Sequence, residues 1–537
     1  MPTVNLNRKE VERLVGKKIP IEELKDRISM LGTDLEEVTD NEITVEIFPN
    51  RPDMLSEQGF ARALSSFLKV KTGLRTYKTV KSNYKVIIHP SVSKVRPHTV
   101  CAVVKNLICN EENLKSIIQI QEKLHKSYGR NRKKVAIGIY PLEKITFPIT
   151  YTAKPPREII FIPLDGKKEL TAEQILQQHP TGKEYAHLLE GEKIYPIFQD
   201  SKNNILSMPP IINSETVGKV TTKTKDVFIE CSGFDNNTLS KCLNIIITSL
   251  ADMNGIIYEV TLEGSTSRIS PDLQPTEISL DIPYANKILG LQLKEQEIKQ
   301  LLERMGYGYE KKKVLVPSYR ADILHQIDII EDIAIAYGYE NFQETIPNVA
   351  TIGQESKQSL LNSKITEVLT GFGLLECNTV SLSNEQDLNR KMNLKNQLVE
   401  VESPVNTEYN ILRNSMIPTL LKVLSENKHH EYPQNLFEIG KIFDDVQDKD
   451  SLGITITENF TKIKQTFEAV AAAFAWKYEI IATEHPSFIP GRVGKILVDG
   501  KELGVLGELH PEVLEHWNIE TTISALELDV DAILKQK

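Results

Sequence analysis

The chain has 537 residues, 40% of them hydrophobic and 26% charged, and its 64 basic and 73 acidic residues leave a net charge of −9. This composition is typical of a globular protein of several domains, at roughly 100–200 residues for each domain. The acidic balance excludes nonspecific nucleic-acid binding driven by overall charge, but not a local basic footprint.

Cysteine usage and hydropathy exclude further classes. No two cysteines form a C-x-x-C pair, so we expect neither a structural zinc nor a disulfide framework. The N-terminus shows no apolar signal region, and no apolar run approaches the length of about 18 residues that a membrane span needs. We therefore expect a cytoplasmic protein without a membrane segment. The cysteines are Cys101, Cys109, Cys231, Cys242 and Cys377.

In chain order, residues 1–80 predict a small α/β unit: a short strand, a helix that begins after Asn7, a second helix, and a third helix capped by Ser56. From 85 to 265, β-rich runs such as "YKVIIHP", "KVAIGIY" and "KDVFIECSG" alternate with helical stretches such as 113–129. This alternation predicts an α+β domain.

Residues 274–345 predict a compact module that ends in an acidic helix over Gln326–Tyr337, followed by Gly338. Four carboxylates lie in or just before this helix, and they have two readings. As a solvated face, Asp322 would cap the helix and Asp328 would favour its N-terminal dipole. As a cation or partner site, the face would explain the like-charge pair Asp328 and Asp332, and an isoleucine amid the acids. The residues alone leave both readings open. The four are Asp322, Asp328, Glu331 and Asp332.

Residues 350–537 return to an α/β pattern. We expect an amphipathic helix over 361–376, a strand over 377–383, a helix over 417–430 and a strand over 434–445. No Walker phosphate loop, strand-linked G-x-G-x-x-G, H-E-x-x-H or G-x-S-x-G motif occurs anywhere in the chain.

Six segments, in order along the chain, resemble the beta chain of phenylalanyl-tRNA synthetase in its archaeal and eukaryotic form. They are "FPNRPDMLSEQGFARAL", "KKVAIGIYPLEKI", "PPIINSETVGKV", "VPSYRADILHQIDIIEDIAIAYGYENF", "LRNSMIPTLLKVL" and "HPSFIPGRVGKI". The resemblance implies an α+β multidomain chain: an N-terminal α/β domain (1–80), an editing-like domain (85–265), a small module with the acidic helix (274–345), and a degenerate class II catalytic-like domain with an antiparallel sheet (350–537).

The resemblance also implies partners and cofactors. Two alpha and two beta chains would form a heterotetramer that joins phenylalanine to its tRNA, with the synthetic site and most of the ATP contacts on the alpha chain. Residues 350–537 contain no G-x-G-x-x-x-R type segment, so we expect them to form an interface with the alpha chain rather than an active site. In the family the matching acidic positions, here Asp322, Asp328, Glu331 and Asp332, are assigned to Mg²⁺ shared with that chain.

The domain over 85–265 would hydrolyse tyrosyl-tRNA formed in error, because an apolar pocket for phenylalanine rejects an added hydroxyl poorly. Glu230, after the apolar run Val227–Ile229, would accept the phenolic hydroxyl of tyrosine, and Asn213 matches a pocket residue of the family. The alternatives are a strand that reaches solvent at Glu230 and a capping or turn role for Asn213.

One departure from the family pattern stands in this domain: Tyr140-Pro141 replaces the usual His-Asp. It supports a rival reading, a non-enzymatic tRNA-binding or assembly subunit in which editing has decayed. A magnesium-dependent phosphohydrolase using the acidic helix is a third reading, which lacks an accompanying nucleophile or phosphate loop. "RNRKK" (130–134) is the best local basic cluster for an RNA backbone, with a solvated charge run as the alternative.

Overall fold

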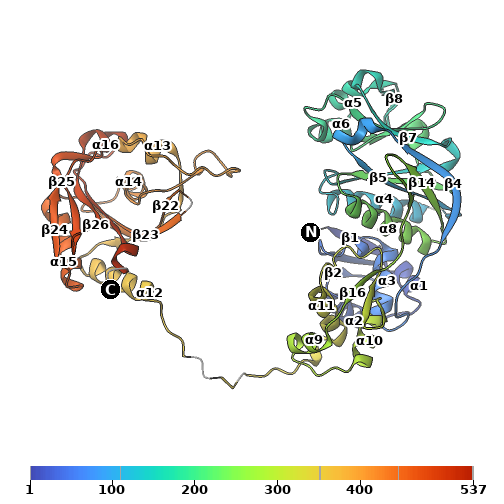
Figure 1. The fold of residues 1–537 in the computed structure, drawn as a ribbon, viewed down its shortest axis with the longest axis horizontal. Coiled ribbons are helices and arrows are strands. Elements are labelled where there is room, and N and C mark those ends of the chain that lie inside the picture. The colour runs from blue at the N-terminus through green and yellow to red at the C-terminus, as the bar shows by residue number, and fades with distance from the viewer. Residues whose placement is uncertain (1, 109–110, 347, 350–351, 446, 535–537) are drawn as a thin grey trace. The chain divides into compact units, whose positions relative to one another are not determined.

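The structure, a computed structural model, describes residues 2–108, 111–346, 348–349, 352–445 and 447–534. It contains two compact units, Met1–Thr345 and Ile346–Lys537, each built from sheets and helices (Figure 1). The fold is thus a multidomain α+β fold, as the sequence predicts. Among the described residues, no helix is long and apolar enough to cross a membrane. The four described cysteines are free thiols, and Cys109 lies outside the described residues.

The first unit begins with a three-stranded antiparallel sheet in the order β1-β3-β2. The Asn7 side chain accepts a hydrogen bond from Glu10 N (3.2 Å), and Ser56 Oγ accepts one from Gly59 N (3.1 Å), so both predicted helix caps are confirmed. The elements are β1 (Thr3–Asn7), α1 (Arg8–Val15), α2 (Ile21–Met30), β2 (Asp34–Val38), β3 (Glu42–Glu46) and α3 (Glu57–Phe67).

A ten-stranded mixed sheet follows, with the strand order β12-β11-β10-β7-β4-β14-β5-β13-β6 and with β15 paired to β14. Its strands are β4 (Thr79–Ile88), β5 (His98–Lys105), β6 (Val135–Pro141), β7 (Ile149–Lys154), β10 (Tyr195–Gln199), β11 (Ile205–Met208), β12 (Ile212–Asn213), β13 (Val227–Gly233), β14 (Ile256–Glu263) and β15 (Ser267–Ser270). The accompanying elements are α4 (Glu111–Lys126), α5 (Ala172–Gln178), α6 (Pro180–Tyr185), α7 (Glu215–Gly218), α8 (Asn236–Asp252) and a separate pair, β8 (Ile160–Phe161) with β9 (Leu170–Thr171).

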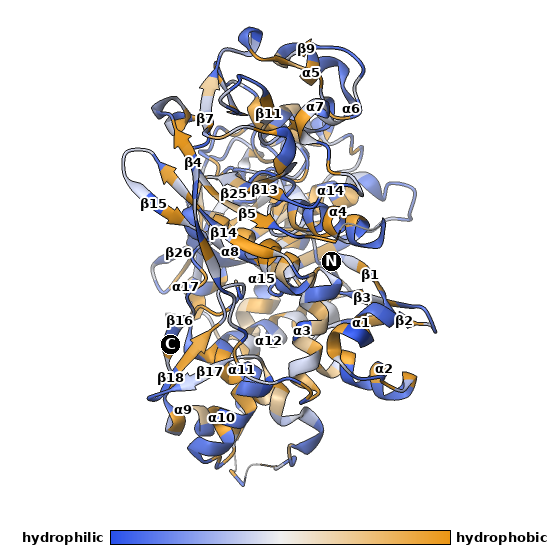
Figure 2. Ribbon diagram, turned by 90° about the vertical axis from the view of Figure 1, so that its right-hand side faces the viewer, coloured by the Kyte–Doolittle hydropathy of each residue, from blue (hydrophilic) through white to orange (hydrophobic). Residues whose placement is uncertain are grey.

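Side chains of β13 alternate between two apolar clusters. Val227, Ile229 and Cys231 pack in a cluster with residues of α4 and α8, whereas Phe228 packs on the opposite face with Tyr140 and other residues. Figure 2 shows the hydrophobic character of β5 and α8 in this region. Helix α8 is not among the elements expected from the sequence, although it is long and mostly buried. The alternation decides which face of the sheet Glu230 occupies.

Strand β6 is the last strand of the sheet, and α4 covers its open edge. The Ile137 N–H donates to His125 Nε2 (2.8 Å), and Gln121 Nε2 donates to the Ile137 carbonyl (2.9 Å). Because an uncovered edge strand exposes unpaired backbone groups, these side chains of α4 replace the missing neighbour strand.

A third sheet of the first unit has the order β16-β18-β17, with α9, α10 and α11 beside it. Helix α11 has the predicted bounds and ends at Gly338 (φ +95°), but its N-cap is His325 and not Asp322. Asp332 is buried (5% exposed), so this helix face does not simply meet water. The elements are β16 (Thr276–Ser279), α9 (Ile282–Leu289), α10 (Glu295–Arg304), β17 (Gly308–Glu310), β18 (Lys313–Val316) and α11 (Gln326–Tyr337).

The second unit is built on a seven-stranded sheet in the order β19-β22-β23-β27-β26-β25-β24, antiparallel except for the pair β19 and β22. Its strands are β19 (Leu375–Glu376), β22 (Asn435–Asp444), β23 (Gln447–Ile456), β24 (Tyr478–Ala482), β25 (Phe488–Val498), β26 (Lys501–Leu509) and β27 (Ser524–Asp529). Its other elements are α12 (Lys357–Gly371), β20 (Leu382–Ser383), α13 (Glu385–Leu388), β21 (Ile411–Leu412), α14 (Ile417–Glu426), α15 (Phe460–Ala473), α16 (Pro511–His516) and α17 (Val530–Leu534).

The predicted strand over 377–383 is wrong for most of its length, since only β20 lies in it. The Cys377 N–H donates to the Phe437 carbonyl (2.7 Å), and Thr379 then donates through its N–H and its hydroxyl to the Glu438 carboxylate (3.2 and 2.6 Å). A buried side chain thus takes the place of a partner strand along this segment.

Candidate functional site

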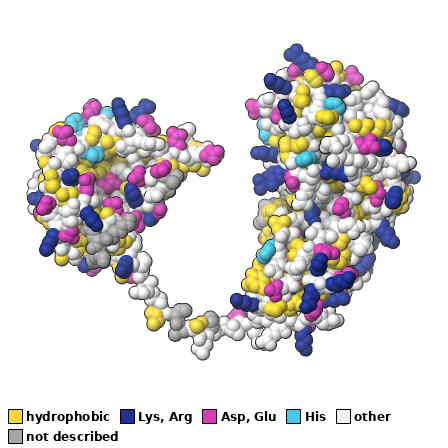
Figure 3. All heavy atoms as spheres, viewed as in Figure 1, with side chains coloured by type: hydrophobic (Ala, Val, Ile, Leu, Met, Phe, Trp, Pro, Cys, Tyr) yellow, Lys and Arg dark blue, Asp and Glu magenta, His cyan; other side chains and the backbone are white. Residues whose placement is uncertain are grey.

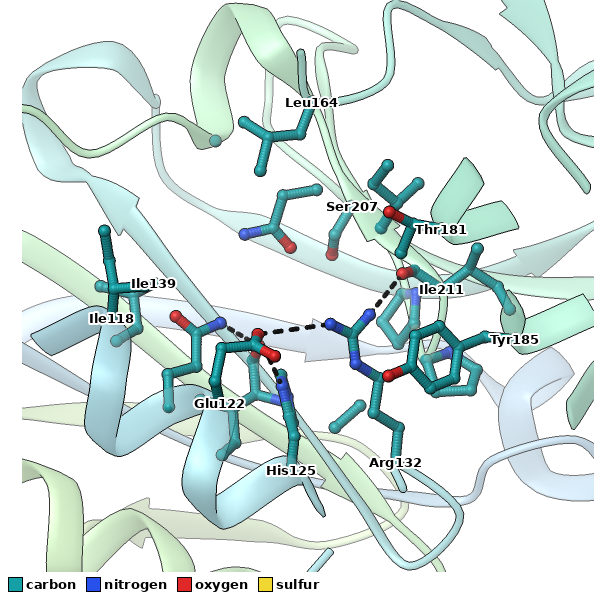
Figure 4. A pocket seen from close by; sticks show the side chains of 18 of the residues that line it. Ile118, Glu122, His125, Arg132, Ile139, Leu164, Thr181, Tyr185, Ser207 and Ile211 are labelled. Atoms are coloured by element: carbon teal, nitrogen blue, oxygen red, sulfur yellow. Dashed lines mark hydrogen bonds and ion pairs between the residues drawn. The ribbon is translucent and has the colours of Figure 1, made fainter. Parts of the chain in front are cut away.

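A cavity of about 560 Å³ lies at the β6 end of the large sheet, between the strands, α4 and the segment around α6 (Figure 4). Its size is within the range of about 300–1,000 Å³ that is common for small-ligand sites. Apolar side chains such as Ile139, Leu164 and Ile211 share its wall with charged and polar ones. The polar lining includes Glu122, His125, Arg132, His179, Ser207, Asn213 and Glu230.

Glu230 lies on β13, the strand next to the last one in the sheet, and is paired with Cys101 of β5 on one side and Gly138 of β6 on the other. It is 1% exposed, and the strand continues to Gly233. The strand therefore does not reach solvent at this residue. An ionised carboxylate at such a position is costly unless hydrogen bonds or charges compensate it.

The partners of the Glu230 carboxyl group occupy one of its two oxygens. The Tyr140 hydroxyl lies within hydrogen-bond distance of Glu230 Oε1 (3.0 Å) and of Ser207 Oγ (2.7 Å). Glu230 Oε2 is buried and has no hydrogen-bond partner of ordinary length among the described residues. Burial raises the pKa of Glu230 to about 8, although Tyr140, Arg96 and Ser232 all favour the charged form. Oε2 is thus a buried oxygen without such a partner, on a residue that lines the cavity.

Asn213 lines the same cavity as Glu230, so the structure brings the two predicted residues together. Asn213 ends β12 and lies opposite Ser207 of β11. Its backbone carbonyl accepts from Leu164 N (2.9 Å). Ser207 is 2% exposed and links the two, since it pairs with Asn213 and its hydroxyl meets Tyr140. The cavity therefore has a polar floor formed by three strands.

Charged side chains form the opposite wall, where Figure 4 shows Glu122, His125, Arg132 and Tyr185 close together. Arg132 Nη1 donates to the Ile211 carbonyl (2.7 Å), its Nη2 lies 3.4 Å from Glu122 Oε1, and its guanidinium lies over the Tyr185 ring. Burial lowers the pKa of His125, and a neutral ring whose Nε2 accepts from a backbone N–H carries its proton on Nδ1, toward Glu122. The His125 ring, whose Nδ1 lies 3.5 Å from Glu122 Oε1, and the charge of Arg132 hold the pKa of Glu122 below its ordinary value.

The turn that carries Arg132 has an unusual backbone. Arg130, Asn131 and Arg132 have φ values of 48°, 51° and 65°, in the left-handed region that side chains with a Cβ rarely adopt. Backbone bonds from Arg132 N to the His125 carbonyl (3.1 Å) and from Lys134 N to the Gly129 carbonyl (2.8 Å) hold the turn. The basic cluster 130–134 is thus divided: Arg132 enters the cavity wall, while Arg130, Lys133 and Lys134 are exposed.

The cavity contains residues that sequence reasoning did not select. Ser207 is a single polar residue in the apolar strand β11, which is a detectable signal. His125 is a single histidine on the buried side of α4, and its meaning depends on the edge of β6 that it covers. Glu122 and His179 carry no signal beyond their polarity. Buried Nδ1 of His179 has no partner among the described residues, while its Nε2 lies 3.1 Å from the Leu164 carbonyl.

The acidic helix is organised around an arginine. Arg320 is 2% exposed and bonds to both carboxylate oxygens of Asp322 (2.8 and 2.7 Å) and to Asp332 Oδ2 (2.8 Å). The Tyr307 hydroxyl also donates to Asp332. Burial alone would raise the pKa of Asp322, but the Arg320 charge holds it below its ordinary value. Two of the four predicted metal ligands are therefore engaged in a buried ion-pair network.

The other two predicted ligands, Asp328 and Glu331, are not part of the ion pairs with Arg320. Asp328 Oδ2 accepts from the N–H groups of Leu324 and His325 (both 2.8 Å), which completes a capping box with the N-cap His325. Glu331 has no hydrogen bond or ion pair with the described residues, and its pKa is raised by partial burial and by the charges of Asp332, Asp328 and Asp322. Among the described residues, no group of three or more His, Cys, Asp or Glu side chains is placed to hold a metal ion.

Comparison with known proteins gives a consistent set of relatives. The model of the phenylalanyl tRNA synthetase beta chain CLM domain matches residues 342–530, and that of the tRNA synthetase B5 domain matches residues 278–339. The phenylalanine–tRNA ligase beta subunit of Archaeoglobus fulgidus is 41% identical over 99% of this chain and 98% of its own length. That of Thermococcus kodakarensis is 39% identical over 98% of each.

Among solved structures, an N-terminal fragment of the phenylalanyl-tRNA synthetase beta-subunit from Pyrococcus horikoshii is similar to the first unit. It shares 39% sequence identity and a TM-score of 0.60, and the match covers 63% of this chain and 99% of the fragment. The similarity thus extends over the part of the chain that contains the cavity.

Proposed function

This chain belongs to the family of phenylalanine–tRNA ligase beta subunits, and we propose that it assembles with an alpha chain, two copies of each, into a cytoplasmic enzyme that joins phenylalanine to its tRNA using ATP. The alpha chain would carry the synthetic site and bind ATP. The missing G-x-G-x-x-x-R type segment in residues 350–537 supports this division of labour.

Residues 350–537 would serve as the interface with the alpha chain, in a degenerate class II catalytic-like fold. The largely antiparallel seven-stranded sheet of the second unit supports this assignment. Large apolar side chains that are exposed beside this sheet also support the assignment, since contiguous exposed apolar surface is typical of protein–protein contacts. They include Phe372 (46% exposed), Leu375 (67%) and Val380 (60%).

The cavity in residues 85–265 would hydrolyse tyrosyl-tRNA that carries the phenylalanine anticodon. The observation that carries this proposal is the buried Glu230 Oε2, which has no partner among the described residues although Glu230 lines the cavity. A tyrosine side chain could donate its hydroxyl to this oxygen, whereas phenylalanine would leave the oxygen unpaired. Sites that hydrogen-bond a substrate hydroxyl discriminate strongly against the analogue that lacks it.

The rest of the cavity suits an aminoacyl ester. Asn213 and Ser207 offer neutral polar groups near Glu230. On the opposite wall, Arg132 offers a buried Nε–H that has no partner among the described residues. Glu122 is a partly exposed carboxylate that can orient a water molecule. We assign the hydrolytic step to a positioned water and to the substrate's own groups.

The tRNA would be held largely through its backbone, by exposed basic side chains next to the cavity. The turn after α4 supplies Arg130, Lys133 and Lys134. Figure 3 shows lysine and arginine side chains gathered on the edge of the first unit at the height of β5 and α4 in Figure 1.

Magnesium binding at the acidic helix stays a prediction, and the contacts of the described residues reduce the number of candidate ligands. Asp322 and Asp332 fit poorly, because Arg320 already neutralises them. Glu331 and the second oxygen of Asp328 fit better, since a cation would relieve the negative charge gathered around Glu331. An ion held by these two would need further oxygen ligands from the alpha chain or from water.

A second candidate function is a tRNA-binding or assembly subunit in which editing has decayed. The observation in its favour is that a phenol of the chain itself, from Tyr140, already bonds to Glu230 and Ser207. One experiment separates the two candidates: the assembled enzyme is mixed with tyrosyl-tRNA of the phenylalanine type. Release of tyrosine above the enzyme-free rate supports editing, and release at the enzyme-free rate favours the assembly role.

A further inference from the structure

Tyr140 contacts two residues that line the cavity, Glu230 and Ser207, without being one of the lining residues itself. It is 0% exposed, it belongs to β6, and its ring packs on Phe228 with a centroid distance of 5.9 Å and an interplanar angle of 27°. In the pairing of β6 with β13, Tyr140 lies opposite Phe228, and Gly138 lies opposite Glu230. The ring therefore leans back along its own strand, over Gly138, to bring the hydroxyl to Glu230.

Gly138 makes this approach possible. A Cβ built at Gly138 would lie 2.0 Å from the Tyr140 hydroxyl oxygen and 2.6 Å from Glu230 Oε1. Both distances are shorter than any real contact of a Cβ atom, so the phenol and the carboxyl group occupy space that only glycine leaves free. The hydroxyl is thus fitted to Glu230 through a feature of the backbone.

The hydroxyl of Tyr140 has a single proton for two neighbours. Hydrogen bonds to a charged acceptor are the stronger ones, so with Glu230 ionised the proton is donated to Oε1, and the Ser207 hydroxyl donates to the phenol oxygen. This chain of bonds fixes the carboxyl group by one oxygen. Only Oε2 then remains to contact a ligand.

We propose that Tyr140 is a positioning residue, an inference that rests on the proposed editing function. Tyr140 anchors Glu230 by Oε1 and so presents Oε2 to the cavity. In this way it sets the preference for a substrate side chain that bears a hydroxyl. The alternative is a purely structural role, in which the buried Tyr140 hydroxyl bonds to Glu230 and Ser207 only to satisfy its own hydrogen-bonding capacity.

The ionisable groups around Glu230 come from several elements. Arg96 precedes β5, Cys101 lies on β5, Tyr140 on β6, Tyr151 on β7 and Cys231 on β13. On the cavity side are Glu122, His125 and Arg132. Of the groups that favour the charged form of Glu230, only Tyr140 makes a hydrogen bond of ordinary length to its carboxyl group among the described residues. Removal of the Tyr140 hydroxyl should therefore raise the pKa of Glu230 as well as free its orientation.

The test compares the assembled enzyme with Tyr140→Phe, Glu230→Gln, and both together. Tyr309→Phe is the matched control, because it removes a buried hydroxyl that donates to another carboxylate, Glu295 Oε1 (3.0 Å), and neither residue lines the cavity. The measurement is kcat/KM for deacylation of tyrosyl-tRNA and phenylalanyl-tRNA of the phenylalanine type from pH 6 to 8.5, with the enzyme-free rate subtracted. Melting temperatures show whether each variant is folded.

We expect Tyr140→Phe to reduce the tyrosine-to-phenylalanine ratio by about 10-fold or more, the loss expected for a hydrogen bond to a charged group. The rise of activity with pH should also move to higher pH. Tyr309→Phe should leave both unchanged, and Tyr140→Phe should have no further effect on the ratio when Glu230 is already Gln.

An unchanged ratio and pH profile in Tyr140→Phe would overturn the inference. It would also be overturned if Tyr140→Phe reduced the tyrosine-to-phenylalanine ratio equally in the wild type and in Glu230→Gln. In both cases a wild-type enzyme that deacylates leaves the proposed editing function intact. A wild-type enzyme with no deacylation would instead overturn the editing function, and this inference with it.

Discussion

Gly138 lies directly opposite Glu230 in the pairing of β6 with β13, and a Cβ at Gly138 would come within 2.6 Å of Glu230 Oε1. Gly138→Ala should therefore displace Glu230 and the Tyr140 hydroxyl together. We expect deacylation of tyrosyl-tRNA to fall to near the enzyme-free rate, and stability to fall by about 1–3 kcal/mol, the usual range for overpacking a core. Gly371→Ala, where an added Cβ meets nothing within 4 Å, is the control and should change neither. A fully active Gly138→Ala enzyme would show that this close contact does not shape the site.

Glu230 should make the stability of the chain depend on pH. Its pKa of about 8 lies above the ordinary value of 4.5, so between these pH values the folded chain keeps a proton that the unfolded chain has released. The contribution of Glu230 to stability is therefore present below about pH 4.5 and is lost as pH rises toward 8, by up to ~1.4 kcal/mol per pH unit. Glu230→Gln does not titrate.

The measurement is urea-induced unfolding of the full chain at pH 5, 6.5 and 8, for the wild type and Glu230→Gln. The free energy of unfolding of Glu230→Gln should rise relative to that of the wild type at each step, because all other titrations cancel in the difference. A difference that is constant with pH would mean that Glu230 is ionised throughout, with an ordinary pKa.

Arg320 should be essential to the first unit, because it neutralises two carboxylates that are almost fully buried. Arg320→Met would leave Asp322 and Asp332 without their cation, and removal of one partner from a buried ion pair costs about 3–5 kcal/mol. The control is Lys85→Met, which breaks an exposed pair with Glu263 (2.7 Å) and should cost less than about 1 kcal/mol. Equal losses in thermal unfolding would contradict the role of Arg320 as the organiser of this cluster.

If magnesium binds at the acidic helix, its affinity should depend mostly on Glu331 and Asp328. The double variant Glu331→Gln with Asp328→Asn should raise the magnesium concentration that the assembled enzyme needs for half-maximal aminoacylation, because it removes the two carboxylates that Arg320 does not occupy. Gel filtration would separate this effect from loss of assembly. If magnesium dependence and assembly both stay as in the wild type, the helix face binds neither an ion nor the alpha chain.

Local signals in the sequence predicted helix α11 with its correct bounds. The helix starts at Gln326 and ends before Gly338, and both ends are predictable because residues close in the sequence determine them. The cap was wrong: Asp322 bonds to Arg320 instead, and His325 takes the capping position. The sequence contains Arg320 two residues before Asp322, but the burial that makes the ion pair stronger than a cap comes from the surrounding fold.

The candidate site was predictable only in part for a similar reason. Glu230 stands out because a carboxylate interrupts an apolar strand, and this signal is local. Ser207 and Tyr140 meet it only because β11, near one end of the strand order, comes against β6 and β13 at the other end, a long-range effect of the fold. The division of the basic cluster, with Arg132 turned inward, depends on a left-handed turn that the sequence does not indicate.

The central claim is that Glu230, with Asn213, selects tyrosine in the cavity of the large sheet. The measurement that tests it most directly is hydrolysis of pre-charged tyrosyl-tRNA of the phenylalanine type by the assembled enzyme, comparing the wild type with Glu230→Ala and Asn213→Ala. At pH 8.5, where a carboxyl group with a pKa of about 8 is mostly ionised, Glu230→Ala should reduce the rate by roughly 10- to 150-fold, the equivalent of a hydrogen bond to a charged group, while tRNA binding stays nearly unchanged. Asn213→Ala should also reduce it, and the exposed variant Lys85→Ala should not. Equal rates for the wild type, Glu230→Ala and Asn213→Ala would remove both residues from the site and contradict the account.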